Sequence, residues 1–205
     1  MLHSAVAVRT AFDHLGEAYI RLAADMSDEQ FDLPGLGEWN VRELFAHAIR
    51  AYSTAATYLD AAPSSEVILY SAAEYYHTVL NGGPGLHAQV AARGHAAGEE
   101  MRDDPVGKVR STIEAACVRV GLADDDAPVY TPFGQIALID FLATRVVEAG
   151  VHMLDLQRAL GLDDDLESTA AEIVVVALVA AGDAHQVIRA LTGRGDLPAD
   201  FNILQ

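Results

Sequence analysis

The sequence predicts an all-α protein that folds as one helical bundle. Apolar residues recur at helical spacing in every long segment, and no set of alternating segments indicates a sheet. Of the 205 residues, 51% are hydrophobic, which is enough for one substantial core. We therefore expect a single domain over residues 1–205 with no sheet.

The first two helices are predicted from spacing and from local end signals. Apolar residues share one face over residues 4–25, which predicts the first helix, and a proline with two glycines breaks the chain within residues 32–37. Asn40 can then cap a second helix, with Glu43 reaching back in a capping box. This helix is expected over residues 40–60.

The later helices have boundaries at proline and glycine. They are expected over residues 71–80, as a short helix inside the long connection 61–85, and over 86–120, 135–160 and 168–191. Asp104-Pro105 should interrupt the second of these segments, because proline disfavours helix in the residue before it. The turn Thr131–Gly134 introduces the third, and Gly161 should end it.

Charge and cysteine usage exclude several classes of protein. Thirteen basic residues against thirty acidic ones give a net charge of -17, which would repel a nucleic acid. Cys117 is the sole cysteine, so no disulfide forms within the chain and any metal must be held by nitrogen and oxygen. The sequence shows no signal peptide and no apolar run long enough to span a membrane. We therefore expect a cytoplasmic protein with no membrane partner.

Three residues are candidates for holding a metal ion. Glu148 and His152 lie four residues apart on one predicted helix, so their side chains project from one face within reach of a single ion. His47 lies on an apolar stretch of the second helix, where an imidazole needs a partner. Glu43 has the same spacing to His47, but the helix cap already uses it. Because such spacing is equally typical of a surface contact, the assignment depends on whether the helices bring these residues to one level.

A crossover would bring them to one level. His47 lies seven residues past Asn40, or ~10 Å along its helix, and His152 lies nine residues before Gly161, or ~13 Å from the end of its helix. These depths agree only if the two helices are antiparallel. That arrangement requires the connection 61–85 to return the chain along the bundle, so that the second and third helices run parallel.

Asp155 is the candidate catalytic residue. It lies close to one helical turn beyond His152, where it could orient a metal ligand or act as a general base. A solvent-facing helix residue is the alternative interpretation.

Several of these residues fall in a recognisable pattern. The segment Glu38–His47, the turn Thr131–Gly134 and the pattern Arg145-x-x-Glu148-x-x-x-His152-x-x-Asp155 together resemble the metal-binding domain of mycothiol-dependent maleylpyruvate isomerases, in the DinB-like superfamily. The resemblance covers nearly the whole chain. It implies a DinB-like four-helix bundle with a zinc site on the three matching ligands. The helices predicted above add to this bundle a long crossover between helices 2 and 3 and an extra C-terminal helix. The isomerases carry an additional C-terminal domain without a counterpart in these residues, so we do not take the family name as the substrate.

The three ligands predict a thiol-dependent metalloenzyme. They leave one coordination position open, and a thiol bound there would become a nucleophilic thiolate at neutral pH. The resemblance implies mycothiol as the cosubstrate, in an isomerisation or in transfer of the thiol to an electrophilic small molecule. Zinc (Zn²⁺) is the first choice of metal, although Ni²⁺ and Fe²⁺ also suit two histidines and a carboxylate.

Two other functions and one assembly remain open at this stage. The metal could activate water for hydrolysis, with Asp155 as the base. Alternatively, the ion could have a purely structural role and link two helices of a non-catalytic module. The apolar run Ile173–Ala181 needs cover on nearly all sides, which also predicts a homodimer.

Overall fold

The computed structural model describes residues 3–63, 66–80, 86–199 and 201–203, and within these it leaves out the side chains of 86–89 and 91. The described residues are mostly helical, as predicted. The helices are α1 (Ala5–Asp25), the 3-10 helix η1 (Asp28–Asp32), α2 (Val41–Ala48), α3 (Arg50–Leu59), α4 (Ala72–Leu80), α5 (Leu86–Glu100), α6 (Pro105–Gly121), α7 (Leu138–Ala159), α8 (Ser168–Ala181) and α9 (Ala184–Leu191). The strands are β1 (Ile68–Leu69), β2 (Pro128–Thr131) and β3 (Gly134–Ala137).

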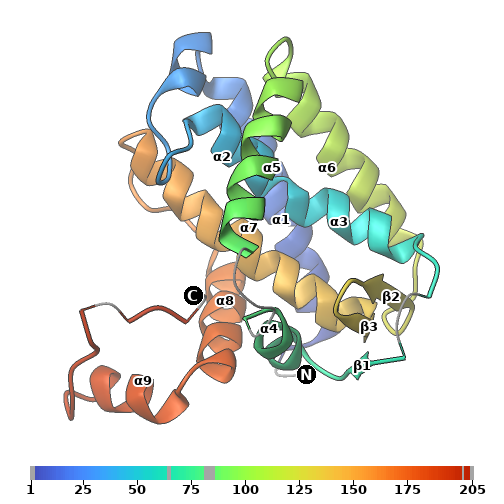
Figure 1. Cartoon of the computed structure of the whole chain (residues 1–205), viewed down its shortest axis with the longest axis vertical. Helices are drawn as coiled ribbons and strands as arrows, with labels where there is room; N and C mark the ends of the chain where they lie inside the picture. Colours follow the sequence, from blue (N-terminus) through green and yellow to red (C-terminus); the bar gives the residue numbers. More distant parts are fainter. Residues whose placement is uncertain (1–2, 64–65, 81–85, 200, 204–205) are drawn as a thin grey trace.

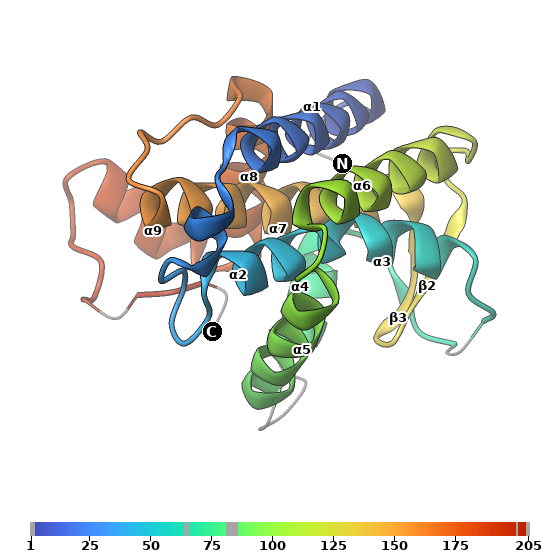
Figure 2. The ribbon, with the colours of Figure 1, turned by 90° about the horizontal axis from the view of Figure 1, so that it is seen from above.

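Four helical segments form the bundle: α1, the pair α2 and α3, α6 and α7. Figures 1 and 2 show that α3 and α6 run in the same direction, toward the β-hairpin, whereas α7 starts at the hairpin and runs back along α3 and α2. The predicted crossover is therefore present. It is longer than the connection 61–85, because α5 projects away from the bundle in Figure 2 and only α6 supplies the third bundle helix.

The predicted end signals form as expected. The Asn40 side chain accepts a hydrogen bond from the Glu43 amide at 2.9 Å, and the Glu43 carboxylate accepts one from the Asn40 amide at 2.8 Å. Asp104 caps α6, with Pro105 as its first residue. Gly161 has a φ of +68°, a left-handed conformation that suits glycine after a helix, and α7 ends there.

The prediction of no sheet was wrong. β2 and β3 form an antiparallel hairpin around the turn Thr131–Gly134, and β1 adds to β3 in parallel. Residues 135–137, which were expected to begin the helix over 135–160, form most of β3, and their apolar pattern runs directly into α7. The alternation in each strand covers only four residues, too short to distinguish from a helix start, and β1 lies far away in the sequence.

Two predicted helices are each divided. The helix predicted over residues 40–60 is interrupted at Ile49. The ψ of -8° at this residue tightens the chain into a turn of the 3-10 type between α2 and α3. The last helix, predicted over residues 168–191, breaks at Gly182, which is extended. Asp183 then caps α9 by accepting from two amides of its first turn.

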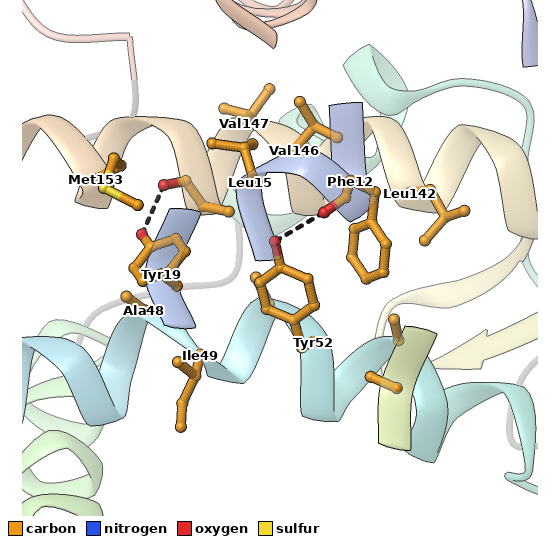
Figure 3. Packing of buried hydrophobic residues seen from close by; sticks show 14 of the residues in the cluster. Phe12, Leu15, Tyr19, Ala48, Ile49, Tyr52, Leu142, Val146, Val147 and Met153 are labelled. Atoms are coloured by element: carbon orange, nitrogen blue, oxygen red, sulfur yellow. Dashed lines mark hydrogen bonds between the residues drawn. The ribbon is translucent and has the colours of Figure 1, made fainter. Parts of the chain in front are cut away.

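The core lies between α1, α7 and the α2–α3 pair, where aromatic side chains are prominent (Figure 3). Tyr52 of α3 donates a hydrogen bond to the carbonyl of Phe12 at 2.9 Å, and Tyr19 of α1 donates to the carbonyl of Ala149 at 2.7 Å. Both hydroxyls are buried, so these bonds remove the cost of burying a polar group. They also fix the position of α1 against the helices that carry the candidate ligands.

Helix α8 packs against α7, and α9 contacts α8. α8 buries residues such as Ile173 and Ala177 against α1, α4 and α7, while Val175 stays 55% exposed. The homodimer therefore stays a prediction. Within the described residues, no helix is both long and apolar enough to cross a membrane.

Candidate metal centre

Two antiparallel helices bring the three predicted ligands together. His47 comes from α2, and Glu148 and His152 come from α7; one ligand atom from each lies within 4.8 Å of the others. Within the described residues, this is the group of histidine, cysteine and acidic residues that meets the spacing of a metal site. The rings of His47 and His152 meet edge to face with centroids 4.8 Å apart.

The turn before α2 positions His47. Backbone hydrogen bonds from Gly35 to Trp39 and from Val41 to Leu33 close this turn at 2.8 and 2.9 Å. The Trp39 indole then lies over the His47 ring, with centroids 4.6 Å apart and planes tilted by 35°. Trp39 therefore covers one face of the imidazole and limits the directions in which the ring can turn.

The His47 imidazole has the two properties that a metal ligand needs, namely an unpaired nitrogen and a neutral charge. Its Nδ1 atom is buried and has no hydrogen-bond partner, which is costly for a buried polar atom. Burial, followed by the nearby charge of His152, lowers the pKa of His47 from 6.5 to about 3. The imidazole is therefore neutral at pH 7 and keeps a lone pair free for a metal.

Asp155 holds His152 in place. The Nδ1 atom of His152 lies 3.2 Å from Oδ2 of Asp155, while its Nε2 atom lies 4.0 Å from Oε2 of Glu148. The other oxygen of Asp155 accepts a hydrogen bond from Arg158 at 3.0 Å. A carboxylate behind one ring nitrogen directs the other nitrogen toward the site, as is common for histidine ligands.

Glu148 is held by a residue that the sequence did not indicate. The Tyr76 hydroxyl of α4 lies 3.1 Å from Oε1 of Glu148 and 3.0 Å from the carbonyl of Thr144. Burial, and then the Glu148 charge, raise the pKa of Tyr76 well above its usual value, so the hydroxyl keeps its proton. The guanidinium of Arg145, which lies in the same sequence pattern as Glu148 and His152, stacks over the Phe141 ring at 4.6 Å from its centroid. No spacing within one helix could have linked α4 to Glu148.

Helix α5 closes against α2 through two glycines. A Cβ atom at Gly94 would lie 2.5 Å from the Trp39 indole, and one at Gly98 would lie 2.6 Å from the Glu43 side chain. His95, between them, pairs with Glu43 at 2.6 Å. Glu43 is therefore fully engaged by the helix cap and by His95, which agrees with its exclusion from the ligand set.

The donor set fits a divalent ion with an open position. Two imidazole nitrogens and one carboxylate suit zinc, iron or nickel. The Glu148 side chain is 30% exposed, so a small molecule can reach the cluster from solvent. Cys117 lies on α6 in a groove lined with Asp13, Glu17 and Glu114, and it does not belong to the cluster.

A comparison with protein families found one match. Residues 12–157 match the mycothiol maleylpyruvate isomerase N-terminal domain. The match includes all three candidate ligands together with Asp155 and Tyr76. Comparisons with curated proteins and with solved structures gave no match.

Proposed function

The chain belongs to the family of the mycothiol maleylpyruvate isomerase N-terminal domain, and from that membership we propose that it is a thiol-dependent metalloenzyme. His47, Glu148 and His152 would hold one divalent ion, with zinc as the first choice. The observation that carries the proposal is the convergence of their ligand atoms within 4.8 Å. When bound, the ion would supply a Lewis acid that lowers the pKa of a thiol at the open position.

The protein residues around the cluster would orient it. Asp155 acts through His152, because both of its carboxylate oxygens already have partners. Tyr76 would hold one oxygen of Glu148 and leave the other free to act as a ligand. Such contacts fix the direction of each ligand and raise metal affinity.

The reaction class follows from the nucleophile. The sulfur of the thiol, mycothiol in our proposal, forms a bond to an electrophilic carbon of a small-molecule substrate. As the carbon–sulfur bond forms, an activated double bond of the substrate opens and its electron pair takes up a proton, and in a transfer this adduct is the product. In an isomerisation the carbon–sulfur bond then breaks again, the proton is lost, and the double bond and the thiolate are both recovered. We place this chemistry in the cytoplasm.

The contacts of Asp155 also bear on the two other functions. A hydrolase would need a free base near the open position, and Asp155 is engaged by His152 and Arg158. A purely structural zinc site is usually closed by four protein ligands, whereas the cluster among the described residues has three. Both observations favour the thiol-dependent enzyme.

Cobalt substitution tests the proposal directly. The cobalt-loaded protein should develop a sulfur-to-metal charge-transfer band when mycothiol is added, and His152→Ala should not. A wild-type protein that binds cobalt but develops no band would contradict the thiol mechanism and leave the metal site intact. Consumption of candidate electrophiles, with and without mycothiol, would then identify the substrate.

A further inference from the structure

A cavity that does not include the candidate metal ligands lies at the other end of α7. Its volume is about 230 Å³, and residues at the start of α1, the start of α4, the first turns of α7 and one face of α8 line it. Both α1 and α4 pack against α8, and Figure 1 shows α4 beside α8. Asp140, which lines the cavity, precedes Glu148 by eight residues, or ~12 Å along α7. The cavity is therefore separate from the metal centre.

Apolar side chains form most of the wall of this cavity. Its α8 face consists of residues that recur at helical spacing, namely Ile173, Val176, Ala177 and Ala180. The facing residues on α4 and α7 include three alanines, whose short side chains leave the space between the helices unfilled. An apolar cavity of about 150 Å³ is large enough for benzene. This cavity therefore has room for a small aromatic or aliphatic molecule.

Two polar groups in the wall have no partner among the described residues. The Nε2 atom of His3 is buried and accepts or donates no hydrogen bond there. Asp140 lies in the first turn of α7, and its carboxylate forms no ion pair or hydrogen bond with the described residues. Burial is the largest cause of a raised pKa at Asp140, and the charge of Glu74 acts in the same direction. A carboxylate with little water around it needs a donor or a cation to offset the cost of burial.

The head group of a small amine fits these two residues. An ammonium has three N–H donors, so it can pair with the Asp140 carboxylate and also donate to Nε2 of His3 when that nitrogen carries no proton. The Glu74 charge and the net charge of -17 favour a cation over an anion at this place. The apolar body of the amine would cover Ile173 and Val176 from water.

We propose that this cavity binds a small apolar amine, with its ammonium group on Asp140 and its apolar body against the α8 face. The ligand class is a primary amine on a short aromatic or aliphatic group. A second copy of the chain is the other possible occupant, because α8 also exposes Val175. An unpaired acid inside an otherwise apolar wall favours the amine over the apolar surface of a second copy. The site does not involve the metal, so it is independent of the proposed function.

The first test compares benzylamine with benzyl alcohol, which has nearly the same shape and no charge. Titration of the full chain, followed by NMR of the ligand, should show at least ~10-fold tighter binding of benzylamine, which is about 1.4 kcal/mol. Asp140→Asn retains the shape of the side chain and removes its charge, so it should lose most of this preference and bind benzyl alcohol as before. Asp164→Asn changes an exposed acid outside the cavity and is the matched control, which should keep the preference.

A larger side chain in the wall tests where the amine binds. Val176→Phe places a ring in the cavity and should abolish binding of both compounds. Val175→Phe makes the same change at the next residue, which is 55% exposed and does not line the cavity, and should leave binding unchanged. His152→Ala, which removes a proposed metal ligand, should bind benzylamine as the wild type does. Circular dichroism checks that each variant remains helical.

Four results would overturn the amine site. The first is equal benzylamine affinity in the wild type and Asp140→Asn, and the second is binding that Val176→Phe leaves unchanged. The third is loss of benzylamine binding in His152→Ala, which would place the amine at the metal centre. The fourth is no binding of benzylamine to the wild type at millimolar concentration. In that case, a dimer in light scattering that Val176→Phe dissociates would identify a second copy as the occupant.

Discussion

The rings of His47 and His152 meet edge to face across the contact between α2 and α7, with centroids 4.8 Å apart and planes at 82°. The two residues come from opposite halves of the sequence, and each is anchored by a different neighbour, Trp39 for one and Asp155 for the other. Substitutions of these ligands, or of the residues that anchor them, should therefore alter metal binding more than they alter folding.

Replacing a ligand should remove the metal and spare the fold. The wild type should bind about one divalent ion per chain, and His152→Ala should lose most of it, because two remaining ligands hold an ion weakly. The helices should remain, since the core is far larger than the site. Elemental analysis measures the metal, with His185→Ala, an exposed histidine, as the control. Equal metal in wild type and His152→Ala would refute the site assignment.

Removing the Tyr76 hydroxyl should weaken metal binding without removing a ligand. Tyr76→Phe deletes the hydrogen bond to Glu148, and loss of such a contact typically lowers metal affinity by about 10- to 100-fold. Tyr52→Phe deletes a buried hydroxyl bond to the Phe12 carbonyl and serves as the control for stability alone. A competition titration with a chelator measures the affinity. Equal metal affinity in Tyr76→Phe and Tyr52→Phe would show that the Tyr76 hydroxyl serves only as a hydrogen-bond donor to the Thr144 carbonyl.

Asp155→Asn tests whether this residue positions His152. An amide retains the shape but loses the charge that orients the imidazole, so metal affinity should fall by about 10-fold or more. Arg158→Gln removes the other, exposed partner of Asp155 and should change the affinity much less. Unchanged metal affinity in Asp155→Asn would remove its positioning role and favour a general base.

Gly94→Ala should disturb the contact between α5 and Trp39. The new Cβ would lie 2.5 Å from the indole, and such overpacking costs about 1–3 kcal/mol. Trp39 is the single tryptophan, so its fluorescence reports directly on this contact and should shift. Gly121→Ala, whose Cβ would meet nothing within 4 Å, is the control. If Gly94→Ala left both the Trp39 fluorescence spectrum and the free energy of unfolding unchanged, α5 would have to shift without moving the indole, contrary to this prediction.

Cys117 should make stability fall in alkaline solution. Burial, and then the charge of Asp13, raise the pKa of Cys117 from 9.0 to about 12. Between these two values the unfolded thiol ionises and the folded one does not, so the unfolded state gains stability as pH rises through this range. Denaturation of wild type and Cys117→Ala from pH 8 to 11 measures this effect. A pH dependence that is the same in both proteins would exclude it.

The local parts of the fold could be predicted. The cap at Asn40, the interruption at Asp104-Pro105 and the stop at Gly161 depend on residues within one helical turn, and all three are present. The β-sheet could not be predicted in this way, because β3 pairs in parallel with β1, which lies far away in the sequence, and each strand is short. The break at Ile49 also leaves no mark in the apolar spacing.

The sequence by itself determined the candidate ligands. Helical spacing places Glu148 and His152 on one face, and the depth of His47 along its helix matches them once the helices are antiparallel. Only the tertiary structure decided what surrounds these residues. Tyr76 reaches Glu148 through the packing of α4, and Gly94 lets α5 approach Trp39, whose indole covers His47. These contacts join helices whose relative placement depends on the whole core, and periodicity within one helix carries no information about it.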